Sequence, residues 1–132
     1  MASNRFLSTD WMTAAEKVLR AGISPQTTGS TDLSIAMTVE NCPEGQTKTL
    51  VVETAQGSLK TFRLAGPEAV KTEFALSGDY RTYERVFKGQ LDPVNAVMNG
   101  DLHFSGNVFK AMGLVKSLQP FFTIIARIPT EF

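Results

Sequence analysis

The sequence predicts a single α+β domain over residues 1–132, with a five-stranded, mainly antiparallel sheet and helices packed on one face. The first observation behind this prediction is a series of four strand-like segments between residues 33 and 77, the clearest of which, residues 33–40, alternates apolar and polar residues with the period of a strand. The second is a change to helical spacing after residue 78, with one short strand-like segment inside it. Strands followed by grouped helices are typical of α+β domains, and 132 residues is the length of one domain.

A helix is predicted at residues 9–21, ahead of the strands. Ser8, Thr9 and Asp10 are residue types that cap helix N-termini, and Gly22 ends the pattern. Between these ends, apolar residues recur at helical spacing and give the helix one apolar side, made of Trp11, Ala14, Ala15, Val18 and Leu19.

Four strands are predicted next, and the short turns between them lead us to expect an antiparallel meander. Leu33, Ile35, Met37 and Val39 alternate with polar or small residues, so one face of the first strand should be buried. Hairpin-length loops require antiparallel neighbours among the first three strands. The four predicted strands cover residues 33–40, 47–54, 58–64 and 71–77.

Capping residues delimit the elements that follow. Asp79 and Asp92 are expected to cap two short helices, which end at Gly89 and Gly100. Pro120 lies within a longer terminal helix and should kink or split it. The predicted elements are helices 79–88 and 93–99, a strand at 101–105, and a terminal helix that begins after Gly106-Asn107.

Charge and cysteine content exclude several classes of protein. Basic and acidic residues balance at 13 each without a basic cluster, which speaks against a nucleic-acid partner. The most apolar stretch, Val108–Ile128, is interrupted by charged residues and a proline, so stable membrane insertion is not expected. Cys42 is the only cysteine, which excludes an internal disulfide and a multi-thiolate metal site. With no apolar leader among the first residues, the sequence predicts a cytoplasmic protein.

The chain carries no recognisable set of catalytic residues. His103 is the only histidine, and strand alternation points it away from the face that Leu102 and Phe104 share. No phosphate-binding loop is present, and the carboxylates that begin elements are explained by helix capping. The sequence therefore predicts a protein that is not an enzyme and that uses no cofactor and no metal.

The segments after residue 79 carry more apolar side chains than one packing stripe requires. Methionine and phenylalanine among them suit the packing of a core. They equally suit the wall of a ligand cavity, because such cavities are mostly apolar and methionine adapts to varied shapes. Periodicity favours neither interpretation over the other.

Several short motifs stand in a distinctive order. Along the chain they are Phe74–Tyr80, Phe87–Pro93 with its Gly89-x-Leu91-Asp92-Pro93, then Ala96, Asn99–Leu102 and Ser105–Asn107. This order, together with the strands from Thr31 onward, resembles the sterol carrier protein-2 family. The resemblance covers roughly two-thirds of the chain. Each motif alone is a weak indication of the family, whereas the order of the motifs along the chain is fairly specific.

The resemblance implies a hydrophobic tunnel between the sheet and the helices, and an apolar ligand such as a fatty acid, an acyl-CoA, a sterol or a related lipid. It implies non-catalytic binding, and transfer, of that ligand. The residues expected to line the tunnel, carried over by position, are Phe74, Tyr83, Val86, Phe87, Val94, Val97, Met98, Leu102, Phe104, Val108, Met112 and Val115.

Three other functions remain open at this point. The protein could present a hydrophobic intermediate to a partner enzyme, or serve as a dimerisation or structural module with a filled core. An enzyme that uses Tyr83, His103 or Asp79 for proton transfer is the third. The apolar segment Pro120–Ile128 could cap the tunnel, pack on helix 9–21 or form a homodimer face.

Overall fold

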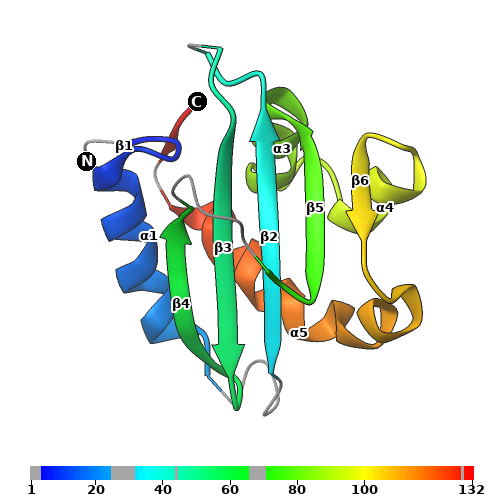
Figure 1. Cartoon of the computed structure of the whole chain (residues 1–132). Coiled ribbons are helices and arrows are strands. Elements are labelled where there is room, and N and C mark those ends of the chain that lie inside the picture. The colour runs from blue at the N-terminus through cyan, green and yellow to red at the C-terminus, as the bar shows by residue number, and fades with distance from the viewer. Residues whose placement is uncertain (1–3, 25–31, 44, 66–70, 129) are drawn as a thin grey trace.

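Five strands lie side by side in the order β4-β3-β2-β5-β6 (Figure 1). The computed structural model describes residues 4–24, 32–43, 45–65, 71–128 and 130–132, and for residues 114–118 it describes the backbone alone. The strands are β2 (Leu33–Glu40), β3 (Lys48–Ala55), β4 (Ser58–Leu64), β5 (Phe74–Asp79) and β6 (Leu102–Ser105). The sequence prediction of a five-stranded, mainly antiparallel sheet is confirmed.

The expected four-stranded meander is wrong at its fourth strand. The β2, β3 and β4 strands pair antiparallel as predicted, whereas β5 pairs with β2, in parallel, instead of continuing from β4. The reason is that the connection over residues 65–73 is longer than a hairpin turn and so does not force antiparallel neighbours. The result is that β2, the strand with the clearest apolar alternation, lies in the middle of the sheet.

The register of the sheet concentrates apolar side chains on one face. Ile35 of β2 lies opposite Val52 and Phe74, and these three residues are almost fully buried. His103 of β6 lies opposite Ser77 and is exposed, because alternation turns it to the other face. The sheet therefore has one face that carries the core and one polar face, as the sequence predicted for His103.

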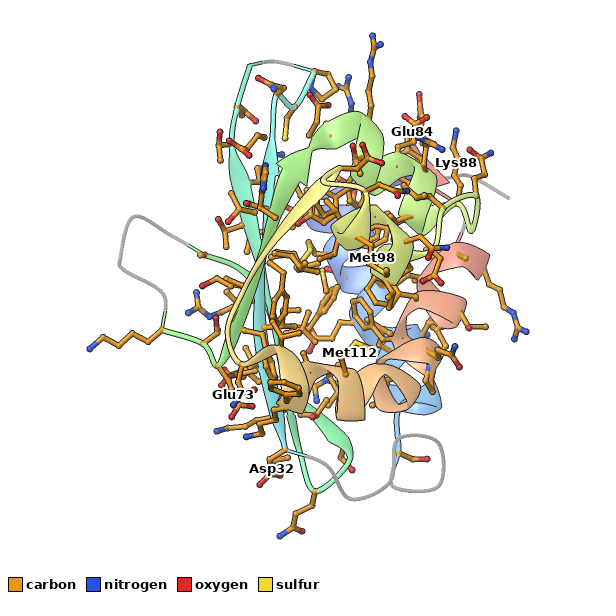
Figure 2. The ribbon with its side chains drawn as sticks, turned by 90° about the vertical axis from the view of Figure 1, so that its right-hand side faces the viewer. Asp32, Glu73, Glu84, Lys88, Met98 and Met112 are labelled. Carbon is orange, nitrogen blue, oxygen red and sulfur yellow. The ribbon has the colours of Figure 1, made fainter. Side chains whose placement is uncertain are left out.

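The four described helices all lie on the core-bearing side of the sheet (Figure 2). Each begins at a residue whose side chain accepts a hydrogen bond from a backbone N–H of the first turn, which stabilises the helix start. The helices, with their caps, are α1 (Thr9–Gly22, Ser8), α3 (Tyr80–Phe87, Asp79), α4 (Pro93–Met98, Asp92) and α5 (Val108–Arg127, Asn107).

Of the expected kink or split of the terminal helix at Pro120, the split does not occur, because α5 is one continuous helix through Pro120. A proline inside a helix removes one backbone hydrogen bond and crowds the preceding turn. Phe121 and Ile125, which follow it, are buried in the core and hold the second half of the helix in place. Burial of these side chains outweighs the local cost of the proline.

The two ends of the chain meet in a pair of short strands that sequence analysis did not predict. The strands β1 (Asn4–Arg5) and β7 (Thr130–Glu131) pair in parallel, and the indole Nε1 of Trp11 donates to Thr130 Oγ1 at 2.9 Å. Phe6 packs edge-on against Trp11 and Phe87, with ring centroids 5.0 and 5.2 Å away. These contacts anchor the C-terminal end of α5 beside α1.

We predict that Gly106→Ala destabilises the fold, because Gly106 sets the path from β6 into α5. Its φ is +134°, and a Cβ there would lie 2.8 Å from Phe74 Cδ1 and 2.9 Å from the Glu73 carbonyl oxygen. Strain and overpacking should lower the free energy of unfolding by about 2 kcal/mol or more in urea titrations.

The matched control is Gly113→Ala, within α5, where a Cβ meets no described atom within 4 Å. Alanine has the higher helix propensity, so this variant should gain roughly 0.8 kcal/mol. Equal stability changes in the two variants would contradict the structural role assigned to Gly106.

Candidate functional site

A cavity of about 800 Å³ lies between the sheet and helices α3, α4 and α5. It is a size typical of small-molecule sites, and most of the residues around it are apolar. Figure 2 shows Met98 on α4 and Met112 on α5, and both residues line the cavity. The residues around the cavity are Ile35, Leu76, Val86, Gly89, Leu91, Asp92, Pro93, Val94, Val97, Met98, Phe104, Val108, Ala111, Met112, Gln119, Phe122, Thr123, Ala126 and Arg127.

Helix α5 forms the longest wall of the cavity. Its lining residues recur three or four positions apart, the spacing of one helix face. Val108 and Met112 near its start are largely exposed, whereas Phe121 and Ile125 near its end are buried. Both halves of α5 therefore border the cavity, and the second half also packs into the core through another face.

The short helix α4 closes another side. Ala96 is fully buried and fixes the helix, while Val94, Val97 and Met98 line the cavity. The Asp92 carboxylate accepts a hydrogen bond of 3.0 Å from the Val94 N–H and so caps the helix start. Met98 is 78% exposed, so part of this wall is open to solvent.

The structure brings most of the predicted site residues together around this cavity. Those that line it are Val86, Val94, Val97, Met98, Phe104, Val108 and Met112. Val115 belongs to α5, and its side chain lies outside the described residues. Only a structure with a bound ligand would establish that these residues contact it, so their role in ligand binding stays a prediction.

Four predicted residues lie in the core and not on the cavity wall: Phe74, Tyr83, Phe87 and Leu102 are all nearly inaccessible to solvent. The physical reason is that each packs against another element. The Phe87 ring contacts those of Phe6 and Tyr83, and Leu102 lies against Gly78. Helical spacing identified the buried side of α3, and it could not separate Val86, which reaches the cavity, from its neighbours.

Sequence reasoning missed the polar part of the cavity wall. Gln119, Thr123 and Arg127 lie at four-residue intervals on α5, together with Phe122 and Ala126. The signal was present, because these positions continue the helix face that includes Val108 and Met112. A search confined to apolar side chains overlooked it.

The segment Pro120–Ile128 does one of the three things that the sequence left open, and its capping of the tunnel stays a prediction. It packs on α1, where a Cβ at Gly22 would lie 2.5 Å from Ile124 Cδ1. It also lines the cavity through Phe122, Thr123 and Ala126. The third alternative, a homodimer face, stays a prediction.

The residues considered for proton transfer do not meet in space. Tyr83 is buried in the core, and its hydroxyl has no hydrogen-bond partner among the described residues; burial raises its pKa well above the usual value. Asp79 accepts from the Arg81 N–H at 2.9 Å and from Asn41 Nδ2 at 3.1 Å, and these hydrogen bonds lower its pKa. His103 is on the opposite face of the sheet from Tyr83.

Two further searches cover the described residues only. No group of three or more His, Cys, Asp or Glu residues there is arranged to hold a metal ion. No helix formed by those residues is both long and apolar enough to cross a membrane.

The fold is that of sterol carrier protein 2 structures. A crystal structure of sterol carrier protein 2 matches with a TM-score of 0.78 at 20% identity, over 94% of this chain and 99% of that one. The solution structure of a conserved hypothetical protein from Thermus thermophilus matches with a TM-score of 0.78 at 20% identity, over 98% of this chain and 94% of that one. Palmitated SCP2L2 from Aedes aegypti matches with a TM-score of 0.58 at 10% identity, over 86% of this chain and 96% of that one.

The sequence itself places the chain in a family. Residues 31–119 match the SCP-2 sterol transfer family, and the chain therefore belongs to that family. This confirms the resemblance that the ordered motifs indicated. A comparison with curated protein sequences finds no match.

We predict that Asp79→Ala weakens the start of α3 and costs about 1 kcal/mol of stability at pH 7, measured by urea unfolding. The folded-state pKa of Asp79 lies below its ordinary value of 3.8. The ionised carboxylate therefore contributes stability above the ordinary pKa and loses that contribution as pH falls through the lowered pKa. The difference between wild type and variant should shrink over the same acidic range.

Asp101→Ala serves as the control, because Asp101 is an exposed carboxylate that caps no described helix. The stability of Asp101→Ala should stay within about 0.5 kcal/mol of the wild-type value, at pH 7 and in the acidic range alike. A loss as large as that of Asp79→Ala would show that general charge effects, and not capping, account for the result.

Proposed function

We propose that this protein binds an apolar ligand of the fatty acid, acyl-CoA or sterol type in the cavity, without chemical conversion, and passes it on. The observation that carries the proposal is the cavity of about 800 Å³ with a mostly apolar wall. Membership of the SCP-2 sterol transfer family supports it. The similarity in fold to palmitated SCP2L2 from Aedes aegypti favours an acyl chain as one occupant.

The energetics of such a site are favourable without a charged contact. Burial of each methylene contributes about 0.8 kcal/mol. Association costs at least about 4 kcal/mol in lost translational and rotational freedom. A chain of more than about ten methylenes therefore has enough apolar surface for useful affinity if most of it is enclosed.

The arrangement of titratable groups supports a non-catalytic role. An active site requires proton-transfer or nucleophilic groups within hydrogen-bond reach of one another. Asp79 and Asp92 are both engaged as helix caps, Tyr83 is enclosed in the core and His103 lies on the polar face of the sheet. A triple replacement of Tyr83, His103 and Asp79 that retained ligand binding and transfer would strengthen this part of the proposal.

A second candidate function is presentation of a hydrophobic intermediate to a partner enzyme. Its specific support is the exposed apolar group Met98, Val108, Phe109 and Met112, of which Phe109 is 91% exposed and lies outside the cavity wall. Exposed apolar side chains grouped on a surface are typical of contact sites. If a pull-down returns no enzyme that acts on a hydrophobic intermediate, while lipid transfer between vesicles is intact, the first candidate function, binding and transfer of a ligand, is favoured.

We also propose that the protein is cytoplasmic, as the sequence predicts. Cys42 is a free, buried thiol with its pKa raised by burial, which is compatible with a reducing compartment. Cell fractionation checks this part separately from ligand binding.

The direct test is native mass spectrometry of the protein purified from cells, followed by titration with a fluorescent fatty acid. We expect co-purified lipid and micromolar or tighter binding. Met112→Gln should weaken binding about tenfold, because it replaces an apolar cavity contact by a neutral polar side chain of similar length.

Phe109→Gln is the matched control, since Phe109 is an exposed apolar residue of the same helix that does not line the cavity. It should leave the fatty acid affinity unchanged. Absence of lipid together with absence of fatty acid binding would overturn the proposed function.

A further inference from the structure

The wall that α5 contributes to the cavity changes character along the helix. Its first part offers Val108, Ala111 and Met112. Its last part offers Gln119, Thr123 and Arg127. At about 1.5 Å per residue, the two ends of this wall are roughly 28 Å apart along the helix axis. The polar residues of this wall therefore lie toward the end of α5, with Phe122 and Ala126 beside them, and its start is apolar.

Arg127 is the only cationic residue among the described residues around the cavity. The only anionic one among them, Asp92, already accepts the hydrogen bond that caps α4. Within the described part of the chain, no hydrogen bond or ion pair involves the Arg127 guanidinium, whereas Lys88 pairs with Glu84 and Lys110 with Glu73. The Arg127 guanidinium therefore has no hydrogen-bond or ion-pair partner among the described residues.

We propose that Arg127 binds the anionic head group of the ligand, and that the preferred ligands are acidic amphiphiles with one apolar chain. The chain then runs along α5 toward Met98 and Met112. This inference rests on the proposed function, and adds to it the polarity of the ligand and a residue that determines specificity.

The chemistry of the site is consistent with such a ligand. A guanidinium donates two parallel hydrogen bonds to a carboxylate or a phosphate, and such charge-assisted bonds are stronger than neutral ones. Arg127, Thr123 and Gln119 are all exposed, so a head group there keeps part of its hydration and avoids the cost of full burial. Thr123 and Gln119 can supply further polar contacts.

A structural explanation for Arg127 also exists and must be separated from the proposal. Basic residues in the last turn of a helix interact favourably with the helix dipole. Arg85 likewise lies in the last turn of its helix, α3, and is exposed without lining the cavity. Arg85 is therefore a matched control: both arginines complement a helix end, and only Arg127 faces the cavity.

The test compares three fluorescent probes of one chain length, which carry a carboxylate, a phosphate monoester or an uncharged alcohol as head group. Wild-type protein should bind at least one of the acidic probes about tenfold more tightly than the alcohol. In Arg127→Gln this preference should disappear, with alcohol affinity unchanged. Arg127→Lys should restore part of it, and Arg85→Gln should behave as wild type.

The outcomes separate the two levels of the proposal. Whether the carboxylate or the phosphate shows the Arg127-dependent preference identifies the acidic head group, and either result supports the inference. If wild type binds all three probes equally, or Arg127→Gln weakens acid and alcohol alike, the inference is overturned while the cavity remains a binding site. If none of the probes binds wild type, the proposed function itself fails. Urea unfolding of each variant shows whether an affinity change reflects lost structure.

Discussion

The packing of the second half of α5 against α1 is the constraint on which the rest of the site depends. Gly22 lets the two helices approach so closely that a side chain there would meet Ile124, and Phe121 and Ile125 are buried beneath. The β1–β7 strand pair and the hydrogen bond from Trp11 to Thr130 hold the segment that follows the C-terminal end of α5. With this half fixed, the helix extends away from α1, its first turns stay exposed, and residues of both halves line the cavity.

The sequence predicted the elements of the fold better than their pairing. Helix starts at Ser8, Asp79, Asp92 and Asn107 follow from local chemistry, because a capping side chain bonds within its own first turn. The parallel pairing of β5 with β2 is not local, since it joins residues almost 40 positions apart, such as Ile35 and Phe74, both of which it leaves buried. The same limit applies to Pro120, whose effect depended on burial of the residues after it.

The candidate site was predicted in outline and not residue by residue. Helical spacing tells which side of α3 is apolar, and it cannot tell whether Val86 and Phe87 meet a void or another ring. In the structure Val86 reaches the cavity, while Phe87 is enclosed by Phe6 and Phe122. The ring of Phe6 comes from the other end of the chain. No short-range pattern in the sequence carries that contact.

The small number of polar groups around the cavity limits what the cavity can do. Asp79 and Asp92 are used to start the short helices α3 and α4, and without such caps helices of this length gain little stability from their own hydrogen bonds. Carboxylates engaged in this way hold the helices that border the cavity in position. Discrimination between ligands is then left to the shape of an apolar wall and to the few polar side chains at one end of α5. This composition is the basis of our proposal that the site binds a whole molecule selectively and performs no chemistry on it.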